Sequence, residues 1–451
     1  MLILYVMVDL LEEKKKVYLK TYGCQMNVYD SDRIIEQLVQ KGFEATPREF
    51  DADLIVLNTC HIREKAAEKV YSELGKYSNL KNKKPKLKIG VAGCVAQAEG
   101  NEIIKRQPLV DFVVGPQTYH TIPTLLEKLT NGQKVVDIEF STQEKFENLK
   151  SAEGKEYKPS QFLTVQEGCD KFCSFCVVPY TRGVEVSRPL SEILSEAKTL
   201  TEYGAIEITL LGQNVNAYNG LDDSKKRRDL SYLIHKLSEI DGLKRIRFVT
   251  SHPVDMTDSL IQTFRSNEKL MPYLHLPIQS GSDEILKKMN RRHNVSDYLN
   301  IIEKVREARP DIAISGDFIV GFPGESDCDF ERTLEVCHNV CYASAFSFKY
   351  SPRPGTTAFE KKEVPEYIKK ERLAVLQDVI SQHQSAFQKN LVGKTLSVLV
   401  EKKGRIEGQV VGKSPYLQPV FFSGASALIG KIVDINITGS ESNSLSGNFC
   451  E

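Results

Sequence analysis

Three cysteines in one short segment are the residues best suited to chemistry. Cys169, Cys173 and Cys176 stand in CDKFCSFC, with the spacing C-x3-C-x2-C. Three thiolates at this spacing can hold three irons of a [4Fe–4S] cluster and leave the fourth iron open to a small chelating molecule. A structural zinc site takes four N or S ligands, and the next histidine along the chain is His235. The segment therefore favours an iron–sulfur site, with zinc or an unliganded loop as the alternatives.

A second set of cysteines is spread along the first hundred residues. Cys24, Cys60 and Cys94 are separated by 36 and 34 residues. Each follows an apolar run of strand length, and each precedes an amphipathic helical pattern. This alternation predicts a doubly wound parallel sheet with the cysteines at carboxyl strand ends, where ligands sit in open α/β sheets. One such cysteine would be an ordinary packing residue, but three at equivalent positions indicate a second cluster with an open iron.

The elements that must position these cysteines divide the chain into three parts. Residues 15–135 carry the doubly wound sheet, and a polar stretch from Ser141 to Pro159 is interpreted as a linker. Residues 155–387 contain six further strand–helix units, which predict a partial (βα)6 barrel with its active site at the C-terminal face. Residues 388–451 are short strands between glycine and polar turns, which predict a small antiparallel, OB-like β-barrel.

Charge is balanced over the chain but not within it. Lys+Arg and Asp+Glu both number 60 among the 451 residues. A nucleic-acid partner would therefore need a local basic surface. Between Lys389 and Ser440 there are seven basic and three acidic side chains, a net charge of +4. The C-terminal barrel is thus the expected contact for nucleic acid.

Neither the cysteine content nor the N-terminal segment suggests secretion or membrane insertion. Ten cysteines in a large chain without a secretory signal favour metal binding or catalysis over a disulfide scaffold. The first eleven residues are mostly apolar, but they lack a basic n-region and fall short of the ~20 residues that span a bilayer. We interpret them as a frayed leader, or as a start assigned upstream of Met7. The protein is predicted to be cytoplasmic, with no membrane partner.

The cysteine segment, with Phe175 directly before Cys176, resembles the radical S-adenosylmethionine (SAM) superfamily. That resemblance implies a partial α/β barrel in which the methionine end of SAM ligates the open iron and is cleaved to a 5′-deoxyadenosyl radical. Longer motifs, in order along nearly the whole chain after the leader, are similar to those of the methylthiotransferases. They look most like the MiaB-type branch, which acts on tRNA bearing N6-isopentenyladenosine, and the C-terminal barrel resembles its RNA-binding TRAM domain. These motifs are TYGCQMN, NTCHIREKAAEKV, GCVAQAEG, VGPQT, EGCDKFCSFCVVPYTRG, LLGQNVNAY, TSHP, LHLPIQSGS, DFIVGFPGE and YSPRPGT.

The resemblance implies a role for each matching residue. Cys24, Cys60 and Cys94 would ligate an auxiliary [4Fe–4S] cluster, whereas the other three cysteines would ligate the radical-generating one. Further residues would contact SAM at its methionine, ribose and adenine parts: Phe175, Gln213, Asn214, Gln279, Ser280, Gly321, Pro323 and Gly324.

The implied activity is methylthiolation at C2 of N6-(dimethylallyl)adenosine at tRNA position 37. One SAM would methylate a sulfur on the auxiliary cluster, and a second would supply the radical. Because an aromatic C–H offers ordinary acid–base catalysis no leaving group, the cofactors must carry the chemistry. The implied partners are the tRNA anticodon stem-loop and a flavodoxin- or ferredoxin-like electron donor, with the enzyme a monomer. The alternatives are the same chemistry on threonylcarbamoyladenosine tRNA or a ribosomal-protein aspartate, and a non-catalytic iron–sulfur RNA-binding protein.

Several other residues stay open at this point. Arg182 and Arg188 flank the cysteine segment and fit either a phosphate or carboxylate contact or structural ion pairs. Cys337 and Cys341, with His338 between them, could face one metal, but helix packing is favoured. His61 follows a ligand cysteine and could touch a cluster or substrate, although a lone histidine is more often a structural hydrogen-bonder. Cys328 and Cys450 are interpreted as incidental.

Overall fold

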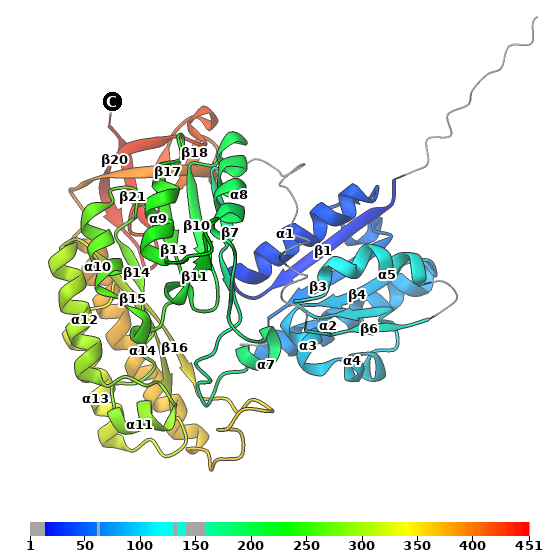
Figure 1. The fold of residues 1–451 in the computed structure, drawn as a ribbon, viewed down its shortest axis with the longest axis horizontal. Coiled ribbons are helices and arrows are strands. Elements are labelled where there is room, and N and C mark those ends of the chain that lie inside the picture. Colours follow the sequence, from blue (N-terminus) through cyan, green and yellow to red (C-terminus); the bar gives the residue numbers. More distant parts are fainter. Residues whose placement is uncertain (1–13, 61–63, 130–132, 141–145, 147–157, 451) are drawn as a thin grey trace, which may run out of the picture. The chain divides into compact units, whose positions relative to one another are not determined.

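The computed structural model describes residues 14–60, 64–129, 133–140, 146 and 158–450, and Figure 1 shows their path along the sequence. The chain forms two compact units, residues 1–149 and 150–451. The apolar leader, His61 and most of the expected linker lie outside the described residues.

A six-stranded parallel sheet forms the first unit, in the order β2-β1-β3-β4-β5-β6. Every residue of β3 is buried, as expected for a parallel strand that is covered on both faces. The strands are β1 (Lys16–Tyr22), β2 (Glu44–Ala45), β3 (Leu54–Thr59), β4 (Lys88–Ala92), β5 (Phe112–Val114) and β6 (Val135–Asp137).

The helices of this unit lie on both faces of the sheet. The chain leaves β1 toward β2 through α1 (Gln25–Gln40), and it leaves β3 in the opposite direction through α2 (Glu64–Lys83). Because parallel crossovers are right-handed, this reversal puts the two helices on opposite faces. Side chains of α2, α3 (Cys94–Glu99) and α4 (Asn101–Arg106) share one core, while α5 (Ile122–Lys128) contacts α1. The doubly wound prediction is confirmed, with the switch point between β1 and β3.

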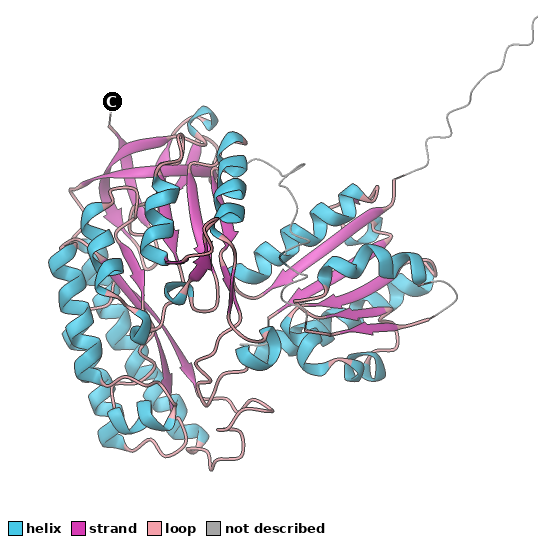
Figure 2. Ribbon diagram, viewed as in Figure 1, coloured by secondary structure: helices cyan, strands magenta, loops and turns pink. Residues whose placement is uncertain are grey.

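Six parallel strands form the partial barrel of the second unit, as predicted. Two three-stranded sheets, β13-β10-β7 and β14-β15-β16, are joined by a parallel bridge between Ile246 and Leu270. Figure 2 shows the helices of this unit along one side of its strands. The strands are β7 (Ser160–Thr164), β10 (Glu207–Leu211), β13 (Arg245–Phe248), β14 (Tyr273–His275), β15 (Ala313–Val320) and β16 (Ser344–Lys349).

The barrel helices begin at sequence signals that fix their ends. The side chains of Asn294 and Ser326 each form a capping box, at the start of α12 (Val295–Ala308) and α13 (Asp327–Val340). Leucine and isoleucine side chains of the helices pack on the strands in one large core. The other helices are α7 (Val178–Arg182), α8 (Leu190–Glu202), α9 (Leu230–Ser238), α10 (Asp258–Ser266), α11 (Asp283–Lys288) and α14 (Glu366–Lys389). Short strand pairs are β8 (Gln166–Glu167) with β9 (Val186–Ser187), and β11 (Asn219–Leu221) with β12 (Arg227–Asp229).

A closed barrel in the order β17-β18-β19-β21-β20 ends the chain. Four of its pairings are antiparallel, but β19 and β21 run parallel. The predicted small antiparallel barrel is confirmed, with one parallel pair, because a ring with an odd number of strands cannot alternate direction throughout. The strands are β17 (Thr395–Lys403), β18 (Gln409–Lys413), β19 (Pro419–Ser423), β20 (Ile432–Ser440) and β21 (Leu445–Phe449).

Two buried arginines fix this small barrel to the larger one. Arg245 donates to the carbonyl oxygens of Ser397 and Lys413, at 2.5 and 3.1 Å. Arg247 donates to the carbonyl oxygen of Ser414 at 2.9 Å and pairs with buried Glu207, also at 2.9 Å. Arg245 and Glu207 are the first residues of β13 and β10. The small barrel therefore sits at the amino ends of these strands, opposite the edge that carries the cysteine loop.

Candidate functional site

The loop that carries Cys169, Cys173 and Cys176 leaves the carboxyl end of β7 through β8. Its start is pinned by the amide of Cys169, which donates to the carbonyl oxygen of Gly183 at 3.2 Å. A tight turn follows, in which the Cys176 amide donates to the Cys173 carbonyl oxygen at 2.9 Å. The amide of Val178 then lies 3.5 Å from the Cys176 sulfur. N–H groups aimed at sulfur are the donors that iron–sulfur thiolates use.

The three sulfurs of this loop interact with one another. Burial, together with the neighbouring Cys173, raises the pKa of Cys169 to about 11 and that of Cys176 to about 12. The three thiols interact electrostatically, and their surroundings disfavour thiolates without a bound cation. Such an arrangement fits ligation to a cationic iron cluster, because the cation stabilises the thiolates.

A second loop, which follows α11, is hydrogen-bonded to the cysteine loop. The Ser174 amide donates to the carbonyl oxygen of Met289 at 2.9 Å. The side-chain amide of Asn290 donates to the carbonyl oxygen of Phe172 at 2.9 Å. Both contacts join segments more than one hundred residues apart.

Arg291 in the same loop contacts Cys173 directly. Its Nη1 lies 3.5 Å from the Cys173 sulfur, and its Nη2 donates to the carbonyl oxygen of Pro277 at 2.5 Å. Sequence reasoning missed Asn290 and Arg291, because KKMNRRH has the composition of an ordinary polar turn and no spacing that marks a ligand.

The end of β10 is tied to the cysteine loop through Gln166. Its Oε1 accepts from the amides of Gln213 and Asn214, at 2.9 and 3.1 Å. The side chain of Gln213 in turn accepts from the Gly168 amide at 2.6 Å. Buried Asn214 donates to Asp255 at 2.8 Å, and its Oδ1 has no partner among the described residues. A buried acceptor beside a carboxylate fits a ligand ammonium group such as that of methionine.

The loop after β15 is also shaped and braced. Gly321 and Gly324 have φ of +70° and +82°, values that favour glycine, and Pro323 between them is buried. The Gly321 amide donates to Glu325 at 2.9 Å. Glu325 is buried and pairs with Arg372 of α14 at 2.7 Å. The turn is thus held in place by α14, the helix that leads to the C-terminal barrel.

Phe175, Gln279 and Ser280 are the remaining residues expected to contact SAM. Phe175 packs in a small apolar cluster with Phe322 of the β15 loop, which brings the cysteine loop and that turn together. Gln279, four residues after the end of β14, has a φ of 79°, which lies in the left-handed region. Ser280 is fully buried, and its hydroxyl lies 3.5 Å from that of Thr333 on α13. Its side chain is therefore engaged with the barrel helix.

Arg182 and Arg188 are structural ion-pair residues. Both are buried. Arg182 pairs with buried Glu167 at 2.7 Å. Arg188 pairs with Glu196 at 2.8 Å and donates to the carbonyl oxygen of Thr164 at 2.9 Å. The sequence left open either a phosphate or carboxylate contact or structural ion pairs, and the structure shows the ion pairs.

In the first unit, Cys24, Cys60 and Cys94 follow β1, β3 and β4, three strands that are neighbours in the sheet. The predicted placement at adjacent carboxyl ends is confirmed. Cys60 and Cys94 are only 3% and 6% exposed, whereas Cys24 is exposed. The first two of these strands flank the switch point, where open α/β sheets bind ligands.

Two glycines let these strand ends approach closely. A Cβ on Gly23 would lie 2.4 Å from the Cβ of Cys60, and one on Gly93 would lie 2.8 Å from the carbonyl oxygen of Thr59. Both glycines have positive φ, at +143° and +90°. Glycine beside Cys24 and beside Cys94 therefore draws both residues toward the Cys60 segment.

Two asparagines, missed by sequence reasoning, organise the same edge. Asn58 donates to the carbonyl oxygen of Asn27 and to the hydroxyl of Ser31, both at 2.9 Å. The thiol of Cys24 lies 3.3 Å from the side-chain oxygen of Asn27. Both asparagines stand within motifs quoted above: Asn27 is the last residue of TYGCQMN, and Asn58 is the first residue of NTCHIREKAAEKV. These motifs were the available signal.

The other cysteines do not form a further site. Cys337 is fully buried in the main core, as the packing interpretation predicted, whereas Cys341 is exposed at the end of α13. Cys328 is exposed and Cys450 is half-buried. In the part of the chain that the structure describes, no three His, Cys, Asp or Glu side chains lie close enough to hold a single metal ion.

Relatives match nearly the whole chain. A tRNA-2-methylthio-N(6)-dimethylallyladenosine synthase from Roseobacter denitrificans is 57% identical over 431 residues, which cover 96% of this chain and 98% of the relative. Another from Ruegeria pomeroyi is 57% identical over 97% of this chain and 100% of its own length. The chain belongs to the tRNA-2-methylthio-N(6)-dimethylallyladenosine synthase family.

Three family models divide this synthase-family chain. The model described as uncharacterized protein family UPF0004 matches residues 16–115, the Radical SAM superfamily matches residues 163–337, and the TRAM domain matches residues 389–449. The two cysteine triplets fall in the first two regions.

A solved structure shows the same fold at low identity. The radical S-adenosylmethionine methyltransferase TsrM from Kitasatospora setae matches with a TM-score of 0.57 and 12% identity, over 77% of each chain. None of the described helices is both long and apolar enough to cross a membrane.

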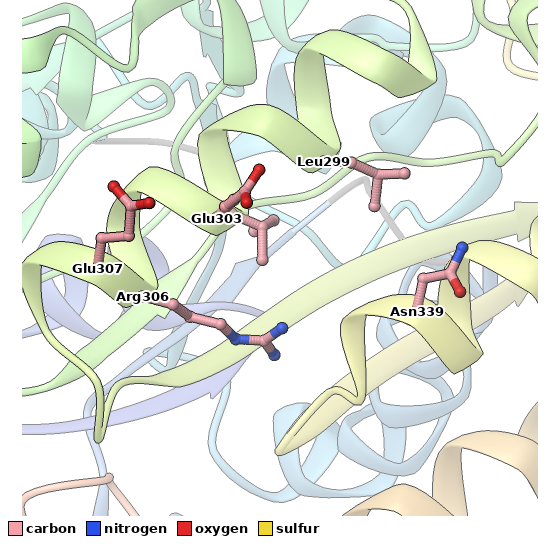
Figure 3. Close-up of a pocket in the computed structure, with 6 residues that line it drawn as sticks. Leu299, Glu303, Arg306, Glu307 and Asn339 are labelled. Carbon is pink, nitrogen blue, oxygen red and sulfur yellow. The ribbon is translucent and has the colours of Figure 1, made fainter.

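One surface hollow of this synthase-family chain lies away from the cysteine loop. It is formed between α12 and α13, and Figure 3 shows charged side chains of α12 around it. It lies on the outer helices and contains none of the predicted site residues. Its lining residues are Leu299, Ile302, Glu303, Arg306, Glu307 and Asn339.

Proposed function

We propose that this protein methylthiolates C2 of N6-(dimethylallyl)adenosine at tRNA position 37, with two [4Fe–4S] clusters and two SAM molecules per product. The observation that carries the proposal is that two cysteine triplets stand at carboxyl edges of two parallel sheets in one chain. One triplet alone would suit any radical SAM enzyme. A second triplet that leaves an iron open suits the delivery of sulfur.

The residues of the cysteine loop hold and tune the radical site. Cys169, Cys173 and Cys176 would ligate the first cluster, and Arg291 and the Val178 amide would donate hydrogen bonds to its sulfurs. When bound, this cluster and SAM supply the 5′-deoxyadenosyl radical and the methyl group, and the auxiliary cluster supplies the sulfur.

Asn214, Gln213 and the β15 turn would orient SAM. The free Oδ1 of Asn214 would accept from the methionine ammonium group, next to the Asp255 carboxylate. The turn from Gly321 to Gly324 would present backbone groups to SAM. Glycine is needed there because φ is positive and because a Cβ on Gly321 would lie 2.3 Å from the side chain of Lys369. Fixed polar groups of this kind would hold SAM in position before the reaction. Less conformational freedom would then be lost on the way to the transition state.

Cys24, Cys60 and Cys94 would ligate the auxiliary cluster. Asn27 and Asn58 fix the backbone around them. The close approach of Gly23 and Gly93 to the Cys60 segment supports one cluster shared by the three cysteines.

The position of the TRAM barrel supports a macromolecular substrate. It is held at the amino ends of the barrel strands, while the cysteine loop leaves their carboxyl ends. Strands β7 and β10 have five residues each, about 17 Å at the usual rise. An RNA that touches both must be an arm such as an anticodon stem-loop and not a free nucleoside. The proposal places the enzyme in the cytoplasm, as a monomer that receives electrons from a flavodoxin- or ferredoxin-like protein.

Nucleoside mass spectrometry of tRNA from a strain that lacks the gene tests the proposal. We expect 2-methylthio-N6-(dimethylallyl)adenosine to disappear and its unthiolated precursor to accumulate. The wild-type gene and a Cys341→Ala control should restore the product, whereas Cys173→Ala and Cys60→Ala should not. An unchanged level of the product would overturn the proposal. Loss of a methylthio group from threonylcarbamoyladenosine or from a ribosomal-protein aspartate would assign the sister reaction instead.

Anaerobic reconstitution tests the two clusters. We expect about eight irons per chain and 5′-deoxyadenosine when reductant and SAM are added. About four irons would leave one site empty, and no 5′-deoxyadenosine would favour a non-catalytic RNA-binding protein.

A further inference from the structure

Two aromatic rings are exposed beside the cysteine loop. Phe172 and Tyr180 are each 47% exposed. Their ring centroids are 6.5 Å apart, and the ring planes are inclined by 81°. The edge-to-face pair of Phe318 with Tyr342, by contrast, is buried in the core. Exposed aromatic surface is costly in water unless a partner covers it.

The backbone under Phe172 is held in an unusual conformation. Its φ is 48°, in the left-handed region that a bulky residue rarely adopts. The side chain of Asn290 donates to the carbonyl oxygens of Phe172 and Lys171, at 2.9 and 3.3 Å. These two bonds fix the direction in which the ring leaves the loop. Strain of this kind persists where the surroundings enforce it, and it gathers at functional sites.

Both rings belong to the segment that carries the cluster ligands. Phe172 directly precedes Cys173, so their Cα atoms are about 3.8 Å apart. Tyr180 lies on α7, which begins two residues after Cys176. The aromatic pair therefore stands at the rim of the proposed radical site, on the edge of the barrel where the reaction would take place.

The rim around the rings combines cationic and apolar side chains. Lys171 is held by an ion pair with Asp255 at 2.8 Å. Arg292, two residues after Asn290, is exposed. Val184 is exposed and directly follows Gly183, whose carbonyl oxygen accepts from the Cys169 amide. Flat apolar surface beside cations is what single-stranded RNA requires, because its bases stack and its phosphates are anionic.

We propose that Phe172 and Tyr180 form a stacking platform for one base that the anticodon loop turns out of its own stack. The inference rests on the proposed function and adds the residues that hold the RNA at the site. Two rings at nearly a right angle form a corner, in which a base lies flat on one ring with its edge against the other. Arg292 is exposed on the loop whose Asn290 holds Phe172, and it would meet the phosphate of that nucleotide.

Binding of an anticodon stem-loop to the anaerobically reconstituted full-length enzyme tests the platform. We expect both Phe172→Leu and Tyr180→Leu to raise the Kd, by about tenfold for the ring on which the base stacks, the usual loss for one stacked base, and by a smaller factor for the ring that meets its edge. Tyr180→Phe keeps the ring and should stay within about twofold of wild type. The matched control is Tyr203→Leu, because Tyr203 is 52% exposed but ends α8, away from the cysteine loop. Iron per chain should be the same in every variant, which separates lost stacking from a damaged cluster loop.

A second RNA decides what lies on the rings. The same stem-loop without the dimethylallyl group should lose affinity by the same factor in the leucine variants, because a base stacks with or without that group. A loss confined to the dimethylallyl RNA would assign the corner to the alkenyl chain and overturn the proposal, as would leucine variants that bind like wild type. Since binding is measured without turnover, failure of the methylthiolation assay would count against the proposed function alone.

Discussion

The Nη1 atom of Arg291 lies 3.5 Å from the sulfur of Cys173. The guanidinium is buried, and its Nη2 is anchored on the carbonyl oxygen of Pro277. A buried cation that donates to a cluster sulfur stabilises the reduced, more negative state of the cluster. Arg291 is therefore a residue that tunes the ease with which the proposed radical cluster accepts an electron.

Replacing Arg291 by methionine should lower the reduction potential of that cluster. Loss of the cation should shift the potential by about 60 mV, which is a tenfold change for a one-electron couple. An anaerobic redox titration followed by electron paramagnetic resonance measures this. Arg292→Met is the control, since Arg292 carries the same charge on the next residue but is exposed. Equal potentials in the Arg291 variant and the wild type would contradict the assignment.

Replacing Gly23 by alanine should empty the auxiliary site and spare the other one. The new Cβ would fall 2.4 Å from the Cβ of Cys60, so the strand ends of Cys24 and Cys60 must separate. We expect iron after reconstitution to fall to about half of the wild-type content. Gly42→Ala is the control, because Gly42 also has positive φ, at +85°, but nothing lies within 4 Å of its Cβ position. An unchanged iron content in the Gly23 variant would show that the approach of these strands does not matter for the cluster.

The parts of the fold that could be predicted are those with strong periodicity. LIVLNT before Cys60 reads as a buried parallel strand, and the structure buries all of it. The fifth strand of the small barrel, LSGNF, has only a weak sequence pattern because it is short and half polar. Without it the odd number of strands, and hence the parallel pair, could not be foreseen.

The site was predictable only where residue type and spacing specify chemistry. The six cysteines meet that condition, and their strand-end positions are as expected. Asn290 and Arg291 do not, because their role depends on contacts with residues more than one hundred positions earlier. Such tertiary contacts leave no local pattern in a single sequence.

Acid should destabilise the barrel through His252. Burial, then the charge of Arg291, lower its pKa from 6.5 to about 2, and its Nδ1 accepts from the Val254 amide. The unfolded chain takes up a proton on this histidine below about pH 6.5, whereas the folded chain does not until near pH 2. Stability therefore falls as the pH falls through this window, by at most about 1.4 kcal/mol per pH unit.

Denaturant unfolding at pH 7.5, 6.0 and 5.0 measures this effect. Between pH 6.0 and 5.0, wild type should lose about 1 kcal/mol more than His252→Gln, which cannot take up the proton. His235→Gln, at an exposed histidine of α9, should follow wild type. Parallel pH profiles for wild type and the His252 variant would refute the prediction.

The basic hairpin of the TRAM barrel should contribute to RNA binding through charge alone. Lys402 and Lys403 are exposed at the end of β17, on a barrel fixed at the strand edge opposite the cysteine loop. Each phosphate contact that is lost should reduce the slope of log K against log salt by about 0.7 to 0.9. Lys402→Gln with Lys403→Gln should therefore reduce the slope by about 1.5 and leave the iron content unchanged. The matched control is Lys198→Gln with Lys304→Gln, which removes two charges from exposed sites on α8 and α12. A slope that is the same in both double variants would mean that the RNA does not lie on this hairpin, and the arm would then have to reach the cysteine loop along another face of the barrel.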